Sequence, residues 1–83
     1  MPEAHKEPLS PTTAEFGRRV RARRAELGLS QEALAANADI HWSYLGQIER
    51  GQVNLTLHSI VRLAATLGVD AGDLVSGLPL PQQ

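Results

Sequence analysis

Glycines separate this chain into short segments. Gly28, Gly51, Gly68 and Gly77 each follow a stretch in which apolar residues recur at helical spacing. Glycine adopts the left-handed backbone that closes a helix at little steric cost, so these positions predict the ends of several short helices. No segment alternates apolar and polar residues over a useful length, which argues against strands. We therefore predict an all-α fold.

Residues that commonly cap helices stand at several of the predicted helix starts. Ser30 precedes the second helix, Thr56 the fourth and Asp70 the fifth. Such side chains accept hydrogen bonds from the free N–H groups of a first helical turn. Asp39 marks the break between the second and third helices, because Asp tolerates the left-handed conformation. The predicted helices cover residues 14–27, 31–38, 41–50 and 57–67, with a short fifth helix after Asp70.

The 83 residues are expected to form one small domain. Residues 1–12 hold prolines among polar residues and predict a disordered arm, residues 13–77 the folded domain, and residues 78–83 a flexible tail. No apolar run approaches the ~20 residues of a membrane span, and the first residues lack the pattern of a signal peptide. The chain has no cysteine. We therefore expect a cytoplasmic protein without disulfides.

Positive charge is concentrated in one segment, although the whole chain is nearly neutral. The formal net charge is −1 and the sequence pI is about 6.3, values that do not favour a nucleic-acid binder. One short stretch nevertheless carries a cluster of arginines, and only Glu26 offsets them nearby. The segment is either a solvated helix face or a contact for nucleic-acid phosphates. Its arginines are Arg18, Arg19, Arg21, Arg23 and Arg24.

Two short helices joined by a tight turn, at residues 31–38 and 41–50, are typical of a helix-turn-helix. The major groove of DNA is about 12 Å wide and admits one α-helix, which a second helix braces. From about Phe16 to Val75 the chain resembles the lambda-repressor-like family, the phage Cro and repressor type. The resemblance lies in GLSQ at 28–31, IERG at 48–51 and LAATLGV at 63–69. With its small size and the NLT segment at 54–56, the chain also resembles the controller proteins of restriction–modification systems.

The resemblance implies a five-helix bundle that binds double-stranded DNA as a homodimer, with half-sites about 10–11 bp apart. The chain would be a sequence-specific transcriptional regulator in the bacterial cytoplasm, associated with the nucleoid, and an activator would also contact RNA polymerase. Base reading falls to the outward face of the third helix. Trp42 on this face either contacts the groove or packs back on the second helix. The implied base-reading residues are Trp42, Ser43, Gly46 and Gln47.

The resemblance also implies which residues hold phosphates and which join the helices. Arg24 and Glu49 match a pair that forms a salt bridge between the first and third helices, and we expect it to be partly buried. Arg19 and Arg23 either face solvent or reach the DNA backbone. His41 stands where the family usually has Ser, Thr or Asp, and is a poorer cap. The implied phosphate contacts are Gln31, Arg50, Gln52, Asn54 and Thr56.

The resemblance implies that dimerisation uses the fifth helix and the end of the fourth, and apolar residues are available there. An apolar patch left exposed on a monomer is unfavourable, which supports pairing. The alternative function is an antitoxin or another protein-interaction module built on the same bundle. The expected interface residues are Leu67, Val69, Leu74, Val75 and Leu78.

Catalysis, cofactors and metals find no support in the sequence. His5, His41 and His58 lack the spacing of a metal site, such as a histidine pair four residues apart on a helix. No glycine-rich phosphate loop or nucleophile motif is present, and a bundle of this size rarely encloses a substrate cavity. We therefore predict a protein that is not an enzyme and that binds no metal or cofactor.

Overall fold

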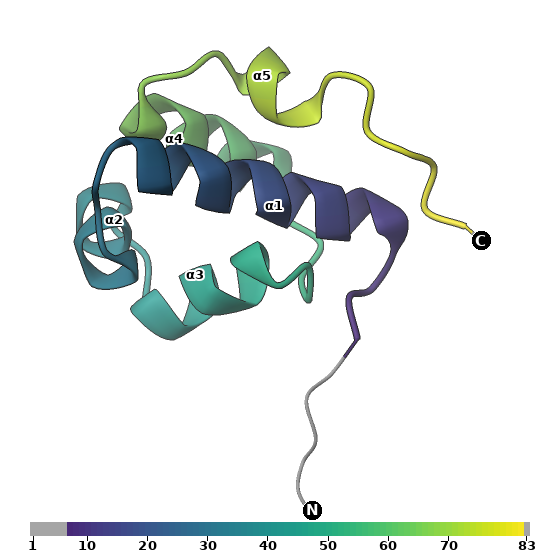
Figure 1. Ribbon diagram of the computed structural model, residues 1–83, viewed down its shortest axis with the longest axis horizontal. Coiled ribbons are helices and arrows are strands. Elements are labelled where there is room, and N and C mark those ends of the chain that lie inside the picture. Colours follow the sequence, from purple (N-terminus) through teal and green to yellow (C-terminus); the bar gives the residue numbers. More distant parts are fainter. Residues whose placement is uncertain (1–6, 83) are drawn as a thin grey trace, which may run out of the picture.

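One long helix, α1 (Pro11–Glu26), crosses the molecule and the shorter helices pack around it. The computed structural model describes residues 7–82. Within this range all regular elements are helices, as the glycine spacing predicts. In Figure 1, α2 and α3 lie below α1 and α4 and α5 above it. The shorter helices are α2 (Gln31–Ala38), α3 (Trp42–Glu49), α4 (Leu57–Leu67) and α5 (Ala71–Val75).

The first helix begins earlier than the sequence analysis predicts, at Pro11 rather than near residue 14. Ser10 Oγ accepts a hydrogen bond from the Thr13 N–H and Thr13 Oγ1 accepts one from the Ser10 N–H, each 3.1 Å long. Pro11 takes the first helical position, where its missing N–H costs nothing. The expected disordered arm is therefore wrong for residues 11 and 12, because the proline starts a helix there. Residues 1–6 of that arm, including His5, lie outside the described residues.

The other helix ends agree closely with the capping pattern. Ser30 Oγ accepts from the Ala33 N–H at 3.0 Å, so α2 begins at Gln31 as predicted. Asp39 has φ 60°, the left-handed conformation predicted for this break. Thr56 Oγ1 accepts from the Ser59 N–H at 3.1 Å at the start of α4. Local side-chain chemistry thus determines where these helices begin and end.

The core lies between α1 and the other helices. Phe16 and Val20 of α1 contribute to it, with Leu34 from α2 and Leu45 and Ile48 from α3. The apolar face of α4 closes the core from the opposite side. Because Leu45 and Ile48 are buried, the other side of α3 is turned outward. The remaining buried apolar residues are Ala35, Ala38, Leu63, Ala64, Leu67 and Leu74.

Two of the residues expected at a dimer interface belong instead to this core. Leu67 and Leu74 are 1% and 2% exposed, so the expectation that they face a partner is wrong. Val69 and Leu78 are half-buried against the core and Val75 is exposed. Leu78, expected in the flexible tail, packs on the protein, and the next residue, Pro79, accepts a hydrogen bond from Thr12 Oγ1 at 2.6 Å.

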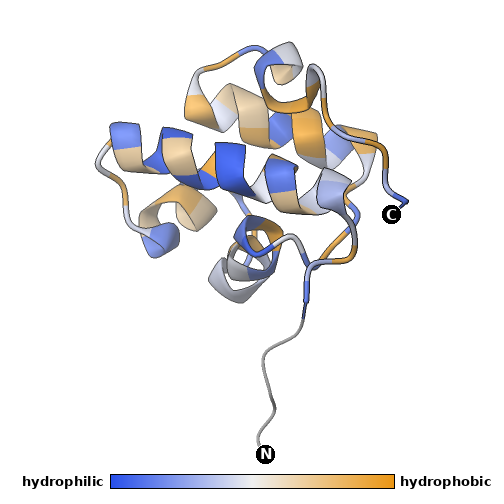
Figure 2. Ribbon diagram, turned by 45° about the vertical axis from the view of Figure 1, so that its right-hand side comes forward, coloured by the Kyte–Doolittle hydropathy of each residue, from blue (hydrophilic) through white to orange (hydrophobic). Residues whose placement is uncertain are grey.

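Hydrophobic side chains also remain exposed on α4. Leu57 is 73% and Val61 52% exposed, one helical turn apart on the same face. Figure 2 shows hydrophobic segments of α4, α5 and the stretch after α5 together, away from α3. We call Leu57, Val61 and Val75 the α4–α5 apolar surface.

Candidate nucleic-acid interface

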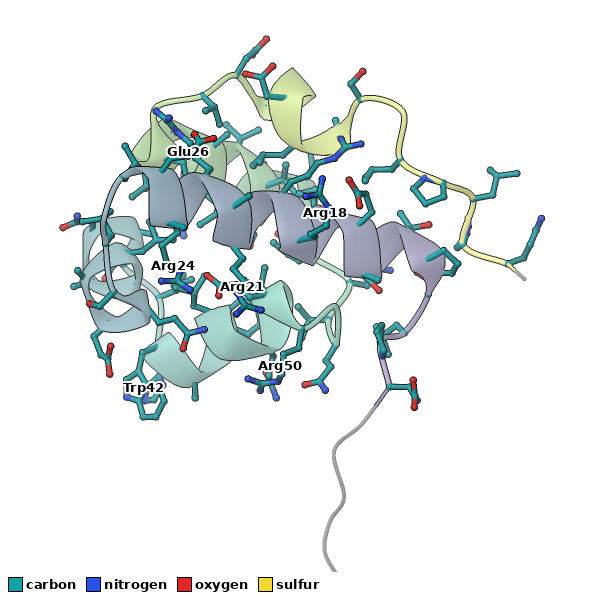
Figure 3. All side chains as sticks on the ribbon, viewed as in Figure 1. Arg18, Arg21, Arg24, Glu26, Trp42 and Arg50 are labelled. Carbon is teal, nitrogen blue, oxygen red and sulfur yellow. The ribbon has the colours of Figure 1, made fainter. Side chains whose placement is uncertain are left out.

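The outward side of α3 is polar and open to solvent. Ser43 and Gln47 are exposed and lie one turn apart, and Trp42 is 53% exposed at the start of the helix. In Figure 3, Trp42 extends from α3 away from α1. Trp42 therefore does not pack back into the protein, and its exposure leaves the groove contact open to it. The Gln47 amide has no partner within residues 7–82, so it is available to an external ligand.

His41 caps α3 through its ring. His41 Nδ1 accepts a hydrogen bond from the Ser43 N–H at 3.1 Å, and Ser43 Oγ lies 2.8 Å from the same nitrogen. The rings of His41 and Trp42 stack at a centroid separation of 6.0 Å. The expectation that His41 is a poorer cap misses this contact, since an imidazole nitrogen replaces the usual hydroxyl or carboxylate oxygen.

Gly46 is not open to the groove in this structure. The residue is buried, and a Cβ placed on it would lie 3.1 Å from Nη1 of Arg50. Gly46 thus lies on the outward face beneath the Arg50 side chain, and close approach of a duplex there requires the guanidinium to move. Figure 3 places Arg50 at the end of α3, on the same outward side as Trp42. Arg50 Nε donates to Gln52 Oε1 at 3.2 Å, which holds the guanidinium beside the loop after α3.

A buried ion pair fixes α3 against α1, as the resemblance implies. Arg24 Nε and Nη2 donate to the two carboxylate oxygens of Glu49 at 2.6 and 3.0 Å. The Glu49 side chain is only 3% exposed, and its hydrogen bonds to Arg24 raise the pKa of that guanidinium above its usual value. Arg24 Nη1 donates to the Leu29 carbonyl at 2.9 Å, and Gln31 Nε2 to Glu49 Oε1 at 2.9 Å. The network joins α1, α2 and α3.

Gln31 therefore has a structural contact besides its predicted phosphate contact. One N–H of its amide is directed to Glu49, and a primary amide carries two. The remaining N–H is the one available to a DNA phosphate. Gln31 sits at the first position of α2, where the helix dipole also favours an anion.

Arg19 and Arg23 lie on the wrong side of α1 for a phosphate contact beside α3. Arg19 Nη1 donates to the Ser76 carbonyl at 2.7 Å, after α5, and Arg23 Nε donates to the Leu67 carbonyl at 3.0 Å, at the end of α4. Both side chains also pair with acids of their own helix, Glu15 and Glu26. The prediction of phosphate contacts at these two residues is wrong, because they tie α1 to the opposite layer.

Within the arginine cluster, Arg21 is an exposed cation on the α3 side of α1. It is exposed and has no hydrogen-bond or ion-pair partner within residues 7–82. Figure 3 shows Arg21 and Arg24 extending from α1 toward α3, with Glu26 on the other side of α1. Residues three positions apart share one face of a helix, so Arg21 lies on the same face of α1 as Arg24, which pairs with Glu49.

The remaining predicted phosphate contacts gather in the loop between α3 and α4. Gln52 is half-buried and hydrogen-bonded to Arg50, and Asn54 is exposed. Thr56 is exposed and its hydroxyl caps α4, with Ser59 Oγ 3.0 Å away. Because this loop follows α3 directly, its polar groups lie at the end of the exposed helix face.

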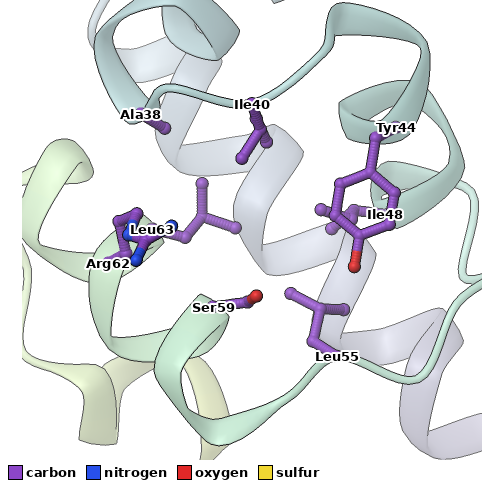
Figure 4. Close-up of a pocket in the computed structure, with 8 residues that line it drawn as sticks. All are labelled: Ala38, Ile40, Tyr44, Ile48, Leu55, Ser59, Arg62 and Leu63. Atoms are coloured by element: carbon purple, nitrogen blue, oxygen red, sulfur yellow. The ribbon is translucent and has the colours of Figure 1, made fainter.

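The hollow beside Tyr44 is too small for a small-molecule substrate. The gap in Figure 4, between α3, α4 and the α2–α3 turn, has a volume of about 10 Å³, roughly the space of one water. Tyr44, Ile40 and Leu63 fill its surroundings, so Tyr44 acts in packing. Among residues 7–82 no three side chains gather as a metal site would need, and no helix has the length and apolarity to cross a bilayer.

Comparisons with known proteins agree with this geometry. A model of the helix-turn-helix family matches residues 20–74. Control protein C.BamHI of Bacillus amyloliquefaciens is 41% identical over 61 residues, which cover 72% of this chain and 75% of that protein.

Solved structures show the same arrangement of helices. The restriction-modification controller protein C.AhdI from Aeromonas hydrophila superimposes with a TM-score of 0.73 at 42% identity, over 75% of this chain and 94% of that one. SinR, a master regulator for biofilm formation solved in complex with DNA, gives a TM-score of 0.70 at 34% identity, over 74% and 98% of the two chains.

Proposed function

The chain belongs to the lambda-repressor-like helix-turn-helix family, and on this basis we propose that it is a transcriptional regulator that inserts α3 into the major groove of double-stranded DNA. The observation that carries the proposal is that one side of α3 is buried and the other side is polar and exposed. Leu45, Ile48 and Glu49 hold the helix from behind. Ser43 and Gln47 are left exposed for base edges.

Each proposed base contact follows from side-chain chemistry. The Gln47 amide can bond both the N6 and the N7 of an adenine. Ser43 offers a hydroxyl to one base edge. Trp42 presents an apolar ring that suits a thymine methyl or a sugar. Gly46 allows close approach to the groove once the Arg50 guanidinium turns from it to a phosphate.

Phosphate contacts flank α3 in this proposal. Arg21 takes the place of Arg19 and Arg23, whose guanidinium groups are bound to the α4–α5 layer. Charge on either side of the recognition helix sets its depth in the groove and makes affinity depend on salt. The phosphate contacts are then Arg21, Gln31, Arg50, Gln52, Asn54 and Thr56.

We further propose that two copies pair through the α4–α5 apolar surface. Val75 lines, with Ile60 and Leu78, a shallow hollow of about 70 Å³, so this surface has relief at its Val75 end. Because α4 and α5 lie on the opposite side of α1 from α3, pairing through them leaves both recognition helices free (Figure 1). The operator would contain two half-sites about one helical turn apart.

Similarity to controller proteins supports a regulator of restriction–modification genes in the bacterial cytoplasm, associated with the nucleoid, with no enzymatic activity of its own. A restriction enzyme or methyltransferase gene beside this gene is the expected genomic observation. If the regulator activates transcription, RNA polymerase is a further partner. An antitoxin role would instead show as a stoichiometric protein that copurifies with the chain.

A gel-shift titration with duplexes selected from a random library tests the proposal. Wild type is expected to bind saturably, and binding to the selected site is expected to be lost in the double variant Ser43→Ala, Gln47→Ala. Arg21→Ala and Arg50→Ala should each weaken binding to all sequences and lower the salt slope by about 1. Arg18→Ala is the control, because Glu15 already pairs with this exposed guanidinium. Unchanged binding in the double variant would disprove the assigned reading face.

A further inference from the structure

His41 holds the hydroxyl of Ser43 in one orientation. Two groups of Ser43 approach the same ring nitrogen: the backbone N–H at 3.1 Å and Oγ at 2.8 Å from His41 Nδ1. Both residues are exposed at the start of α3. A ring that contacts the side chain of a proposed base reader affects what that side chain can offer to a base.

The backbone contact determines the tautomer of the ring. An amide N–H can only donate, so Nδ1 must supply a lone pair, and the proton of the neutral imidazole is then on Nε2. The opposite tautomer would place an N–H of the ring against the N–H of Ser43 at 3.1 Å. Such a contact is repulsive and would leave the cap of α3 unmade. The Nε2–H tautomer is therefore the one that fits.

The tautomer in turn determines the role of Ser43 Oγ. Because Nδ1 carries no proton, the 2.8 Å contact requires that the Ser43 hydroxyl donate to it. A free serine hydroxyl either donates or accepts, and so fits several bases. Here its only hydrogen is already used. Toward a duplex, Ser43 presents lone pairs alone.

We propose that His41 is a specificity-determining residue that makes Ser43 an obligate hydrogen-bond acceptor, so that the Ser43 position of the operator favours adenine or cytosine over guanine or thymine. In the major groove adenine N6 and cytosine N4 carry amino donors, whereas guanine O6 and thymine O4 accept. The inference rests on the proposed insertion of α3 into DNA. It adds that Ser43 accepts, and does not donate, the hydrogen bond to its base.

Two variants at position 41 separate this role from helix capping. His41→Gly removes the acceptor while keeping a residue that N-caps favour, so α3 stays formed and the Ser43 hydroxyl is released. His41→Asp restores an acceptor that has no proton to give, and its negative charge lowers affinity for all sequences alike. Thermal unfolding of each variant confirms that the fold is retained.

The DNA experiment measures relative affinity for all four base pairs at each position of a site selected with wild type. Ser43→Ala identifies the position that Ser43 contacts. There, wild type and His41→Asp are expected to prefer adenine or cytosine roughly two- to tenfold, the range of one hydrogen bond. His41→Gly is expected to lose that preference and to keep the preference at the Gln47 position. A guanine or thymine preference in wild type, an unchanged preference in His41→Gly, or no effect of Ser43→Ala overturns the inference.

A second measurement needs no DNA. Nitrogen-15 NMR of the imidazole in the free protein is expected to show the proton of His41 on Nε2, and the Nδ1–H tautomer would refute the inference even if the protein binds DNA. If wild type enriches no sequence from the library, the proposed function fails and the base preference fails with it. The Nε2–H tautomer would then remain as a feature of the helix cap only.

Discussion

Charged residues in this protein differ sharply in how deeply their ion pairs are buried. Glu49 and Glu26 are both paired with arginines of α1, yet the Glu49 side chain is 3% exposed and that of Glu26 is 66% exposed. A buried pair whose partner is removed leaves an uncompensated charge, whereas water solvates an exposed one. The Arg24–Glu49 pair therefore contributes more to the free energy of unfolding than the Arg23–Glu26 pair does.

Replacing Glu49 by alanine is expected to lower the free energy of unfolding by about 3–5 kcal/mol, because Arg24 and Gln31 both lose their partner. Glu26→Ala is the matched control and should cost less than about 1 kcal/mol. Urea unfolding at neutral pH measures both. Equal losses in the two variants would contradict the burial argument.

Glu15 makes stability depend on acid. Hydrogen bonds from Arg18 and Arg19 lower the pKa of Glu15 from 4.5 to about 2. A group whose pKa is depressed by folding stabilises the fold above its ordinary pKa, and this contribution is lost as pH falls from about 4.5 toward 2. Thermal midpoints of wild type and Glu15→Gln should therefore differ at pH 7 and approach each other as pH falls toward 2.

At the scale of elements, the contact between α1 and α3 is made by backbone as well as side chains. A Cβ at Gly17 would overlap the Ile48 carbonyl oxygen and lie 2.6 Å from that of Glu49. Only glycine allows the helices to approach this closely. The exposed face of α3 is therefore aimed by a backbone contact as well as by the Arg24–Glu49 pair.

Gly17→Ala is expected to destabilise the protein by at least about 1–3 kcal/mol, because α1 and α3 must separate to admit one methyl group. Gly72→Ala provides the control within a helix. Its Cβ would make only ordinary contact, 3.5 Å from Asp70 Oδ2, and should be neutral or stabilising by up to about 1 kcal/mol. Chemical unfolding of the two variants measures the difference. A Gly17→Ala variant as stable as wild type would disprove the close backbone contact.

The sequence predicted helix ends better than helix faces. Ser30 and Asp39 act on their immediate neighbours, so their effect is visible in a short window. Pro11 was assigned to the arm because prolines mark both loops and helix starts. The rotation of α1 depends on packing against distant segments, which is why the sequence does not predict that Arg19 and Arg23 bind the α4–α5 layer. Leu67 and Leu74 were assigned to an interface for the same reason, since only the packed bundle shows that they are covered.

For the whole molecule, two surfaces with different chemistry lie apart. The exposed face of α3 is polar and flanked by arginines, and α4 and α5, which carry the α4–α5 apolar surface, lie on the other side of α1 (Figure 1). A small domain gains stability by covering apolar area, so the second surface provides a reason to pair. Pairing and DNA contact can then be altered separately.

The double variant Val61→Lys, Val75→Lys is expected to be monomeric at concentrations where wild type is dimeric, because it places two charges in the proposed interface. Its affinity for a two-half-site operator should fall, while affinity for a single half-site should stay the same. Leu27→Lys is the control, an exposed leucine at the end of α1. Sedimentation measures the mass of each. A dimeric double variant would place the interface elsewhere.

The division of α3 also bears on how such a regulator can change its targets over generations. Gln47 is exposed and its side chain contacts none of the described residues by hydrogen bond or ion pair. Exchanges at a site of this kind usually shift stability by no more than about 0.5 kcal/mol. A lineage can therefore retarget itself at position 47 without first acquiring compensating mutations. Position 43 is more constrained, because a substituted side chain there must also fit beside the His41 imidazole.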